Sequence, residues 1–240
     1  MSFESANEVP PIIETHALTR DFKKTRAVDS LDLSIRPGEL FGLVGPDGAG
    51  KTTTLRLLAG LLNITSGSAK VAGYDLARQP EAIKRKIGYM AQQFNLYGEL
   101  SVLENLSFFA DLYDVEVSEL RERTERLLAF AGLTEFKDRR AAQLSGGMQK
   151  KLALACTLIH QPEILLLDEP TTGVDPISRR RFLLSIQKTR HLISIGCEVD
   201  FVAEGEALTP IEVKYTSMDS PRIPPTFARS SGDTAPPGRL

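Results

Sequence analysis

The stretch that decides the fold reads Gly45-Pro46-Asp47-Gly48-Ala49-Gly50-Lys51-Thr52. It matches G-x-x-x-x-G-K-[ST], the pattern of a phosphate-binding loop. The apolar run at 40–44 before it predicts a strand buried on both faces. Leucines at helical spacing follow it: Leu55, Leu58, Leu61 and Leu62. Strand, loop and helix in this order place backbone N–H groups and a helix N-terminus around one phosphate.

Each side chain of the loop has an expected task. Lys51 would reach the β- and γ-phosphates of a nucleotide, and the Thr52 hydroxyl would bind Mg²⁺. Glycine allows the tight turns that point N–H groups inward. We therefore expect nucleotide contacts from Gly45, Pro46, Asp47, Gly48, Ala49, Gly50, Lys51, Thr52 and Thr53.

A second acidic motif follows the apolar run Ile164–Leu167. A strand that ends in Asp168 places a carboxylate at the edge of a sheet, where it can hold Mg²⁺ through water. Glu169 comes next and is positioned to orient or deprotonate an attacking water. Without the loop at 45–52 this could equally be an ordinary strand end. With the loop, it completes a nucleotide site.

The segment Leu144-Ser145-Gly146-Gly147-Met148-Gln149 has the same anion-binding features as the first loop. A serine hydroxyl and glycine N–H groups at a helix N-terminus can bind an anion. By itself the segment could equally be a helix cap. A helix is expected from about Gly147 to Ile159, and helical patterning runs from about 105 to 140 with Gly132 as a C-cap.

The order of these motifs closely resembles the ABC ATPase family from about Ile12 to about Arg181. The resemblance implies an α/β fold: a P-loop NTPase sheet core, N-terminal antiparallel β strands and an α-helical subdomain at about 92–145. It also implies ATP and Mg²⁺ as ligands, and transmembrane permease subunits as partners. A second ABC ATPase domain would pair head to tail with this one, as homodimer or heterodimer. The residue strings GPDGAGKTT, FNLY, LSGGM and TTGVDP look most like those in the ATPases of drug-efflux or ABC-2-type exporters.

The resemblance also assigns individual residues. Gln92 matches the family's glutamine loop, which senses the γ-phosphate and Mg²⁺, and Gln93 is the adjacent alternative. Phe22 stands where the family stacks an aromatic ring on adenine, although a core phenylalanine would look the same. Ser145, Gly146 and Gly147 would face the nucleotide held by Lys51 of the second domain. The loop Gly173–Pro176 would cross the interface between the two domains.

Composition restricts the partners. The formal net charge of −2 gives no reason to expect nucleic acid. No apolar run approaches the roughly 18 residues of a membrane span, and the polar N-terminus does not look like a secretory signal. Cys156 and Cys197 lack metal-ligand spacing, which favours reduced thiols. We expect a cytoplasmic protein held at the inner face of the cell membrane by its transmembrane partner.

The C-terminal part departs from the family. After Asp175 the resemblance implies a helix and then a strand that ends in a switch residue, usually histidine, but His191 precedes its apolar run. We expect an open sheet edge unless strands at 192–215 cover it. The segment 196–217 weakly resembles ATPases with a restriction-endonuclease-like domain, because Asp200 and Glu212-Val213-Lys214 reproduce a D…E-x-K spacing. A β-hairpin with an outward-facing Glu and Lys would show the same residues at this spacing.

These observations predict an N-terminal extension at 1–11, an ATP-binding domain at 12–189 and an atypical segment at 190–240. The leading hypothesis is ATP hydrolysis that energises transport through a separate membrane subunit. One alternative is a truncated or fused remnant that binds ATP without efficient hydrolysis, as loss of a γ-phosphate contact would cause. Two others are an ABC ATPase that acts on ribosomes or DNA, and a nuclease that uses the tail motif.

The composition of the tail generates a first prediction. Six of the 14 prolines lie between Pro210 and Pro237, and the last twenty residues are too polar to bury a core. Limited proteolysis of the full chain should therefore cut first beyond about residue 215, leaving a stable fragment that contains the motifs at 45–52 and 164–169. Mass spectrometry of the fragments checks this. A C-terminus that resists protease as long as the motif-bearing region does would contradict it.

Overall fold

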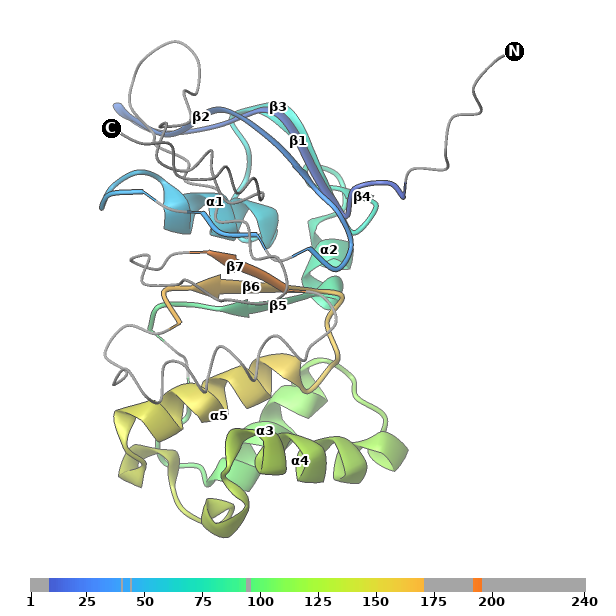
Figure 1. The fold of residues 1–240 in the computed structure, drawn as a ribbon, viewed down its shortest axis with the longest axis vertical. Helices are drawn as coiled ribbons and strands as arrows, with labels where there is room; N and C mark the ends of the chain where they lie inside the picture. The colour runs from blue at the N-terminus through green and yellow to red at the C-terminus, as the bar shows by residue number, and fades with distance from the viewer. Residues whose placement is uncertain (1–8, 40, 44, 94–95, 171–191, 196–240) are drawn as a thin grey trace, which may run out of the picture.

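The computed structural model describes residues 9–39, 41–43, 45–93, 96–170 and 192–195, and the last of these ranges by its backbone alone (Figure 1). The described elements form layers. An antiparallel sheet lies at one end, and helices separate it from a parallel sheet. One long helix covers the opposite face of the parallel sheet, and the remaining helices pack on the far side of that helix; together they form the helical layer (Figure 1). This arrangement confirms the predicted fold class.

The antiparallel sheet contains β1 (Ile13–Phe22), β2 (Thr25–Ile35), β3 (Ser66–Val71) and β4 (Tyr74–Asp75), in the order β2-β1-β3-β4. The two strands expected between residues 12 and 35 are β1 and β2, paired from Ile13 opposite Ile35 to Phe22 opposite Thr25. Sequence analysis did not identify β3 and β4. Ser66–Val71 is largely polar, so its strand conformation depends on pairing with β1.

The parallel sheet contains β5 (Ile87–Met90), β6 (Ile164–Asp168) and β7 (Leu192–Ile195), with β6 in the middle. All five residues of β6 are buried, as the apolar run predicted. Its two faces meet different helices. Ile164 and Leu166 pack in the same cluster as Leu55 and Leu57 of α1 (Lys51–Leu58). Leu165 and Leu167 pack with Ala153 and Leu154 of α5 (Gly146–Leu158).

The helices between the two sheets are α1 and α2 (Pro80–Lys86) (Figure 1). The helix after the phosphate-binding motif is shorter than the leucine spacing suggested. Gly60 has a left-handed backbone, with φ of 68°, and ends the helical path. Leu55 and Leu58 are buried as expected, whereas Leu61 lies past the helix end and is half exposed.

The helical pattern expected over about 105–140 is two α-helices, not one. α3 (Val102–Leu112) begins with a capping box, in which the Ser101 hydroxyl accepts from the Glu104 N–H and the Glu104 carboxylate accepts from the Ser101 N–H. The chain then turns through Asp114, at φ of 54°, into α4 (Val117–Ala131). Gly132 caps α4 in a left-handed conformation, as predicted. Short 3-10 turns at Thr134–Phe136 and Ala141–Gln143 lead to α5.

Two other expectations concern strands. Of the strand predicted at 40–44, residues 41–43 are described; Phe41 forms a bridge and Leu43 is buried, while positions 40 and 44 lie outside the described residues. The edge of β6 that was expected to stay open is paired. β7 runs parallel to β6, with Asp168 opposite Ile195. Thus the beginning of the segment 192–215 covers β6. The loop 173–176, His191 and the tail motif at Asp200 and Glu212–Lys214 lie outside the described residues.

His160, just past α5, joins the parallel sheet to the helical layer. Its Nε2 lies 3.2 Å from the carbonyl oxygen of Ile87 in β5, and its ring stacks on Tyr113 at 3.8 Å between centroids. Burial lowers the pKa of His160 to about 4; the nearby charge of Arg123 acts in the same direction, and the hydrogen bond to the Ile87 carbonyl opposes the shift. The Nδ1 atom is buried with no hydrogen-bond partner among the described residues. The folded protein therefore favours neutral His160.

This geometry predicts acid-sensitive stability. Between about pH 6.5 and 4 the unfolded chain binds a proton at His160 that the folded chain does not, so stability falls as the pH falls through this window. The slope reaches about 1.4 kcal/mol per pH unit for one proton. Urea unfolding at several pH values should show this slope reduced in His160→Gln. The exposed His16→Gln serves as control and should keep it. Equal slopes in all three proteins would refute the assignment.

Candidate functional site

The phosphate-binding motif forms a tight loop against the antiparallel sheet. Gly48 and Gly50 have φ values of 81° and 85°, which side chains other than glycine rarely adopt. A Cβ at Gly50 would lie 2.0 Å from the carbonyl oxygen of Ala27 in β2. Gly50 is also the N-cap of α1 and has no side chain to bond the first N–H groups of the helix. The loop thus presents these donors to an anion.

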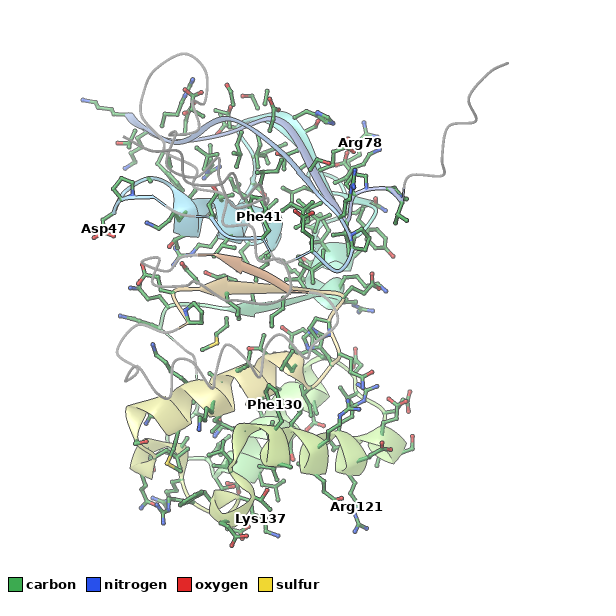
Figure 2. The ribbon with its side chains drawn as sticks, in the orientation of Figure 1. Phe41, Asp47, Arg78, Arg121, Phe130 and Lys137 are labelled. Carbon is green, nitrogen blue, oxygen red and sulfur yellow. The ribbon has the colours of Figure 1, made fainter. Side chains whose placement is uncertain are left out.

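Lys51 folds back over the loop that precedes it. Its Nζ donates to the carbonyl oxygens of Gly45 at 2.6 Å and Pro46 at 2.9 Å. The ammonium group therefore lies beside the start of α1, where an anion would meet both the helix N-terminus and a positive charge. Asp47, labelled in Figure 2, lies at the outer edge of the loop.

Thr52 and Asp168 join the loop to the end of β6. The Thr52 hydroxyl donates to Oδ1 of Asp168 at 2.9 Å, although the two residues are 116 positions apart. Asp168 is buried. Burial raises the pKa of its carboxyl group, and hydrogen bonds from Thr52 and from Tyr89 lower it. Two of the three residues predicted to bind a metal, Thr52 and Asp168, are thus in contact.

Gln92 and Glu169 form a second pair at the same edge. The amide Nε2 of Gln92 donates to Oε2 of Glu169 at 2.8 Å. Glu169 has φ of 49°, a left-handed conformation that costs free energy for a residue with a side chain. This backbone turns the chain sharply after Asp168. The three groups predicted for catalysis or metal binding at positions 92, 168 and 169 therefore lie within one cluster at the carboxyl end of β6.

A comparison with family models decides the identity of this fold. Residues 28–172 match the family model described as ABC transporter. The chain belongs to the ABC transporter family.

Characterised relatives point the same way. The chain is 54% identical over 154 residues to a probable multidrug ABC transporter ATP-binding protein, YbhF of Escherichia coli, a match that covers 64% of this chain and 27% of YbhF. It is 40% identical over 169 residues to the daunorubicin/doxorubicin resistance ATP-binding protein DrrA of Streptomyces peucetius, covering 70% and 51% of the two chains. The chain therefore spans about a quarter to a half of the length of these relatives.

Solved structures of this family have the same fold. A dimeric ATP-binding cassette in a post-hydrolysis state, bound to ADP and Pi, superposes with a TM-score of 0.69 at 27% identity. The match covers 76% of this chain and 87% of the cassette. The fold and the order of motifs are thus those of an ABC cassette.

The segment 144–149, called the signature segment below, lies at the start of α5. Ser145 is the N-cap, and its hydroxyl accepts from the Met148 N–H at 3.4 Å. Ser145 and Gly146 are exposed, and a Cβ at either Gly146 or Gly147 would contact nothing within 4 Å. No hydrogen bond in the described part of the chain joins this segment to the cluster around Asp168. An open helix N-terminus is what a second domain's nucleotide would require.

Phe22 ends β1, close to the turn into β2. Its ring is 40% exposed, and the Arg20 guanidinium lies 4.5 Å from the ring centroid. The core alternative for this residue is therefore disfavoured. Figure 1 shows the β1–β2 turn on the same side of the molecule as the start of α1. An exposed ring on that side is compatible with adenine stacking, which stays a prediction.

Sequence analysis missed Tyr89 and Arg56. The Tyr89 hydroxyl lies 3.3 Å from Oδ2 of Asp168. Burial raises the pKa of both groups, and the positive charge of Arg56 on α1 opposes this shift. The alternation of β5 could have placed Tyr89 on the α1 side, but β5 was not recognised. Within the described residues, no three His, Cys, Asp or Glu side chains gather as metal ligands, and no helix has the length and apolar character needed to cross a membrane.

This geometry predicts the effect of removing the loop cation. Lys51→Ala removes an ammonium group from the anion site, so affinity for Mg-ATP should fall at least about tenfold. Lys137→Ala removes an equal charge from the far end of the helical layer, as Figure 2 shows, and should bind as the unsubstituted protein does. Isothermal titration calorimetry measures both. Equal ATP affinity in Lys51→Ala would refute the site.

Proposed function

We propose that this chain binds ATP with Mg²⁺ and hydrolyses it as the ATP-binding subunit of an exporter-type ABC transporter. The observation that carries the proposal is the hydrogen bond from Thr52 to Asp168, because it unites the phosphate loop with the acidic end of β6. The pair Gln92 and Glu169 stands beside it. These are the groups that phosphoryl transfer to water requires.

Binding is assigned to the loop and its flanks. Backbone N–H groups of residues 45–53 and the start of α1 would surround the phosphates, with Lys51 as their counter-charge. Phe22 would stack on the adenine. Thr52, Asp168 and Gln92 would hold Mg²⁺, Asp168 through water. The hydroxyl and carboxylate oxygens of the first two are ligands that Mg²⁺ prefers. The bound ion would neutralise charge on the phosphates.

Hydrolysis is assigned to Glu169. Its carboxylate would accept a proton from the attacking water, and the amide of Gln92 holds Oε2 in place. The left-handed backbone at Glu169 supports this role, because strained conformations cluster at functional positions. In this arrangement Gln92 also links the base to the segment between β5 and α3, so that a change at the phosphate can reach the helical layer.

The partners follow from the open signature segment. Ser145, Gly146 and Gly147 lie at the start of α5, and among the described residues no hydrogen bond joins their side chains or N–H groups to the phosphate loop. We propose that they contact nucleotide held by Lys51 of a second cassette, in a homodimer or a heterodimer; the similar cassette with ADP and Pi is dimeric. Transmembrane permease subunits would hold the pair at the cytoplasmic face of the membrane. The names of YbhF and DrrA favour export of the drug-efflux kind.

The alternative is a cassette that binds ATP without efficient turnover. It was motivated by the expected loss of a strand and of a γ-phosphate contact after β6. Because every residue of β7 pairs with β6, the first of these two reasons is weakened. Turnover by the purified full chain separates the two functions. Turnover should also be measured after the residues from about 190 onward are replaced by a family-type ending. This tests whether the C-terminal segment restricts the rate of ATP hydrolysis.

A substitution of the base gives the direct test. Glu169→Gln keeps shape and removes the proton acceptor, so ATP turnover should fall about 10²- to 10⁴-fold while Mg-ATP stays bound. Glu135→Gln, on the exposed 3-10 turn of the helical layer, is the matched control and should turn over normally. Phosphate release and nucleotide binding are measured on the same preparations. Unchanged hydrolysis in Glu169→Gln would mean that another group activates the water.

A further inference from the structure

Tyr89 reaches the proposed metal site from a strand that carries none of the recognised motifs. It lies on β5 opposite Leu166 of β6. Side chains alternate along a strand, so Leu166 and Asp168 share one face of β6 and Tyr89 lies on that same face. Tyr89 and Leu166 both pack in the cluster on the α1 side. The length of the phenol ring spans the distance along the strand to Asp168.

The carboxylate of Asp168 is held at both oxygens by different elements. Thr52, from α1, donates to Oδ1 at 2.9 Å, and the Tyr89 hydroxyl, from β5, donates to Oδ2 at 3.3 Å. With one donor the carboxylate could turn about its Cβ–Cγ bond. With two donors its plane is fixed. Tyr89 is half-buried, so water competes poorly for this bond.

We propose that Tyr89 is a positioning residue for Asp168: its phenolic hydroxyl holds Oδ2, so that the carboxylate is already oriented when Mg²⁺ enters with the nucleotide. This inference rests on the proposed function, because it takes Asp168 as the residue that holds Mg²⁺. It adds a residue outside the loop, the acidic strand end and the signature segment. Tyr89 would not touch the nucleotide. Its effect on Mg²⁺ would pass through Asp168, while Arg56 of α1 interacts with both groups.

The positioning role of Tyr89 can be tested by nucleotide binding alone, without ATP turnover. The readout is the ratio of affinities for adenylyl imidodiphosphate, a non-hydrolysable ATP analogue, in excess Mg²⁺ and in EDTA. Tyr89→Phe keeps the ring and removes one hydroxyl. The ratio should fall about 5- to 10-fold, at the low end for groups that orient metal ligands because 3.3 Å is a long hydrogen bond. Affinity in EDTA should stay within about twofold, since no group that meets the phosphates changes.

Two controls separate positioning from packing. Tyr113→Phe removes a phenolic hydroxyl from the helical layer, where Tyr113 stacks on His160, and should leave the ratio unchanged. In an Asp168→Asn background, Tyr89→Phe should lower the ratio by less than about twofold, because the group on which it acts has been replaced.

The outcomes are distinguishable. An unchanged ratio in Tyr89→Phe overturns the inference and leaves the proposed function standing. The same is true of a full 5- to 10-fold loss in the Asp168→Asn background. Equal affinity of the unsubstituted protein with and without Mg²⁺ overturns the assignment of the metal site itself. Failure to bind the analogue in either condition overturns the proposed function.

Discussion

Strand β6 is covered on both faces, and this constraint determines where the chain can place its charges. α1 packs on one face and α5 on the other, so a charged side chain within the strand would be buried without water. Only the last residue, Asp168, reaches an edge where neighbouring elements supply donors. The site therefore forms at the carboxyl end of the parallel sheet, as it does in open α/β sheets generally.

Local patterns allowed most of this edge to be predicted. The loop at 45–52 and the pair Asp168 and Glu169 need particular residue types at fixed spacing, so the sequence alone identified them. Tyr89 has no such pattern, because a tyrosine in a four-residue strand looks like any half-buried residue. Its partner is 79 positions away, and only the register of β5 against β6 brings the two together.

The fold was less predictable where one element depends on another. The strand β3 is polar and exists because β1 offers it a partner, so neither periodicity nor composition reveals it. The helical pattern over 105–140 hid a break, because Asp114 adopts a left-handed conformation that asparagine and aspartate tolerate better than most residues. The gap after β6 is closed by Leu192–Ile195, which lies within the segment 192–215 that the sequence offered as a possible cover, but the pairing partner could not be read from the apolar run itself.

The backbone of Gly50 packs directly against β2, so the phosphate loop lies in close contact with the antiparallel sheet. The Ala27 carbonyl occupies the space where any other residue would place its first side-chain carbon. The hairpin that carries Phe22 and the loop that carries Lys51 therefore meet in direct backbone contact, so a tilt of the sheet would press on the loop. The two residues proposed to hold opposite ends of a nucleotide thus belong to segments that the backbone itself brings together.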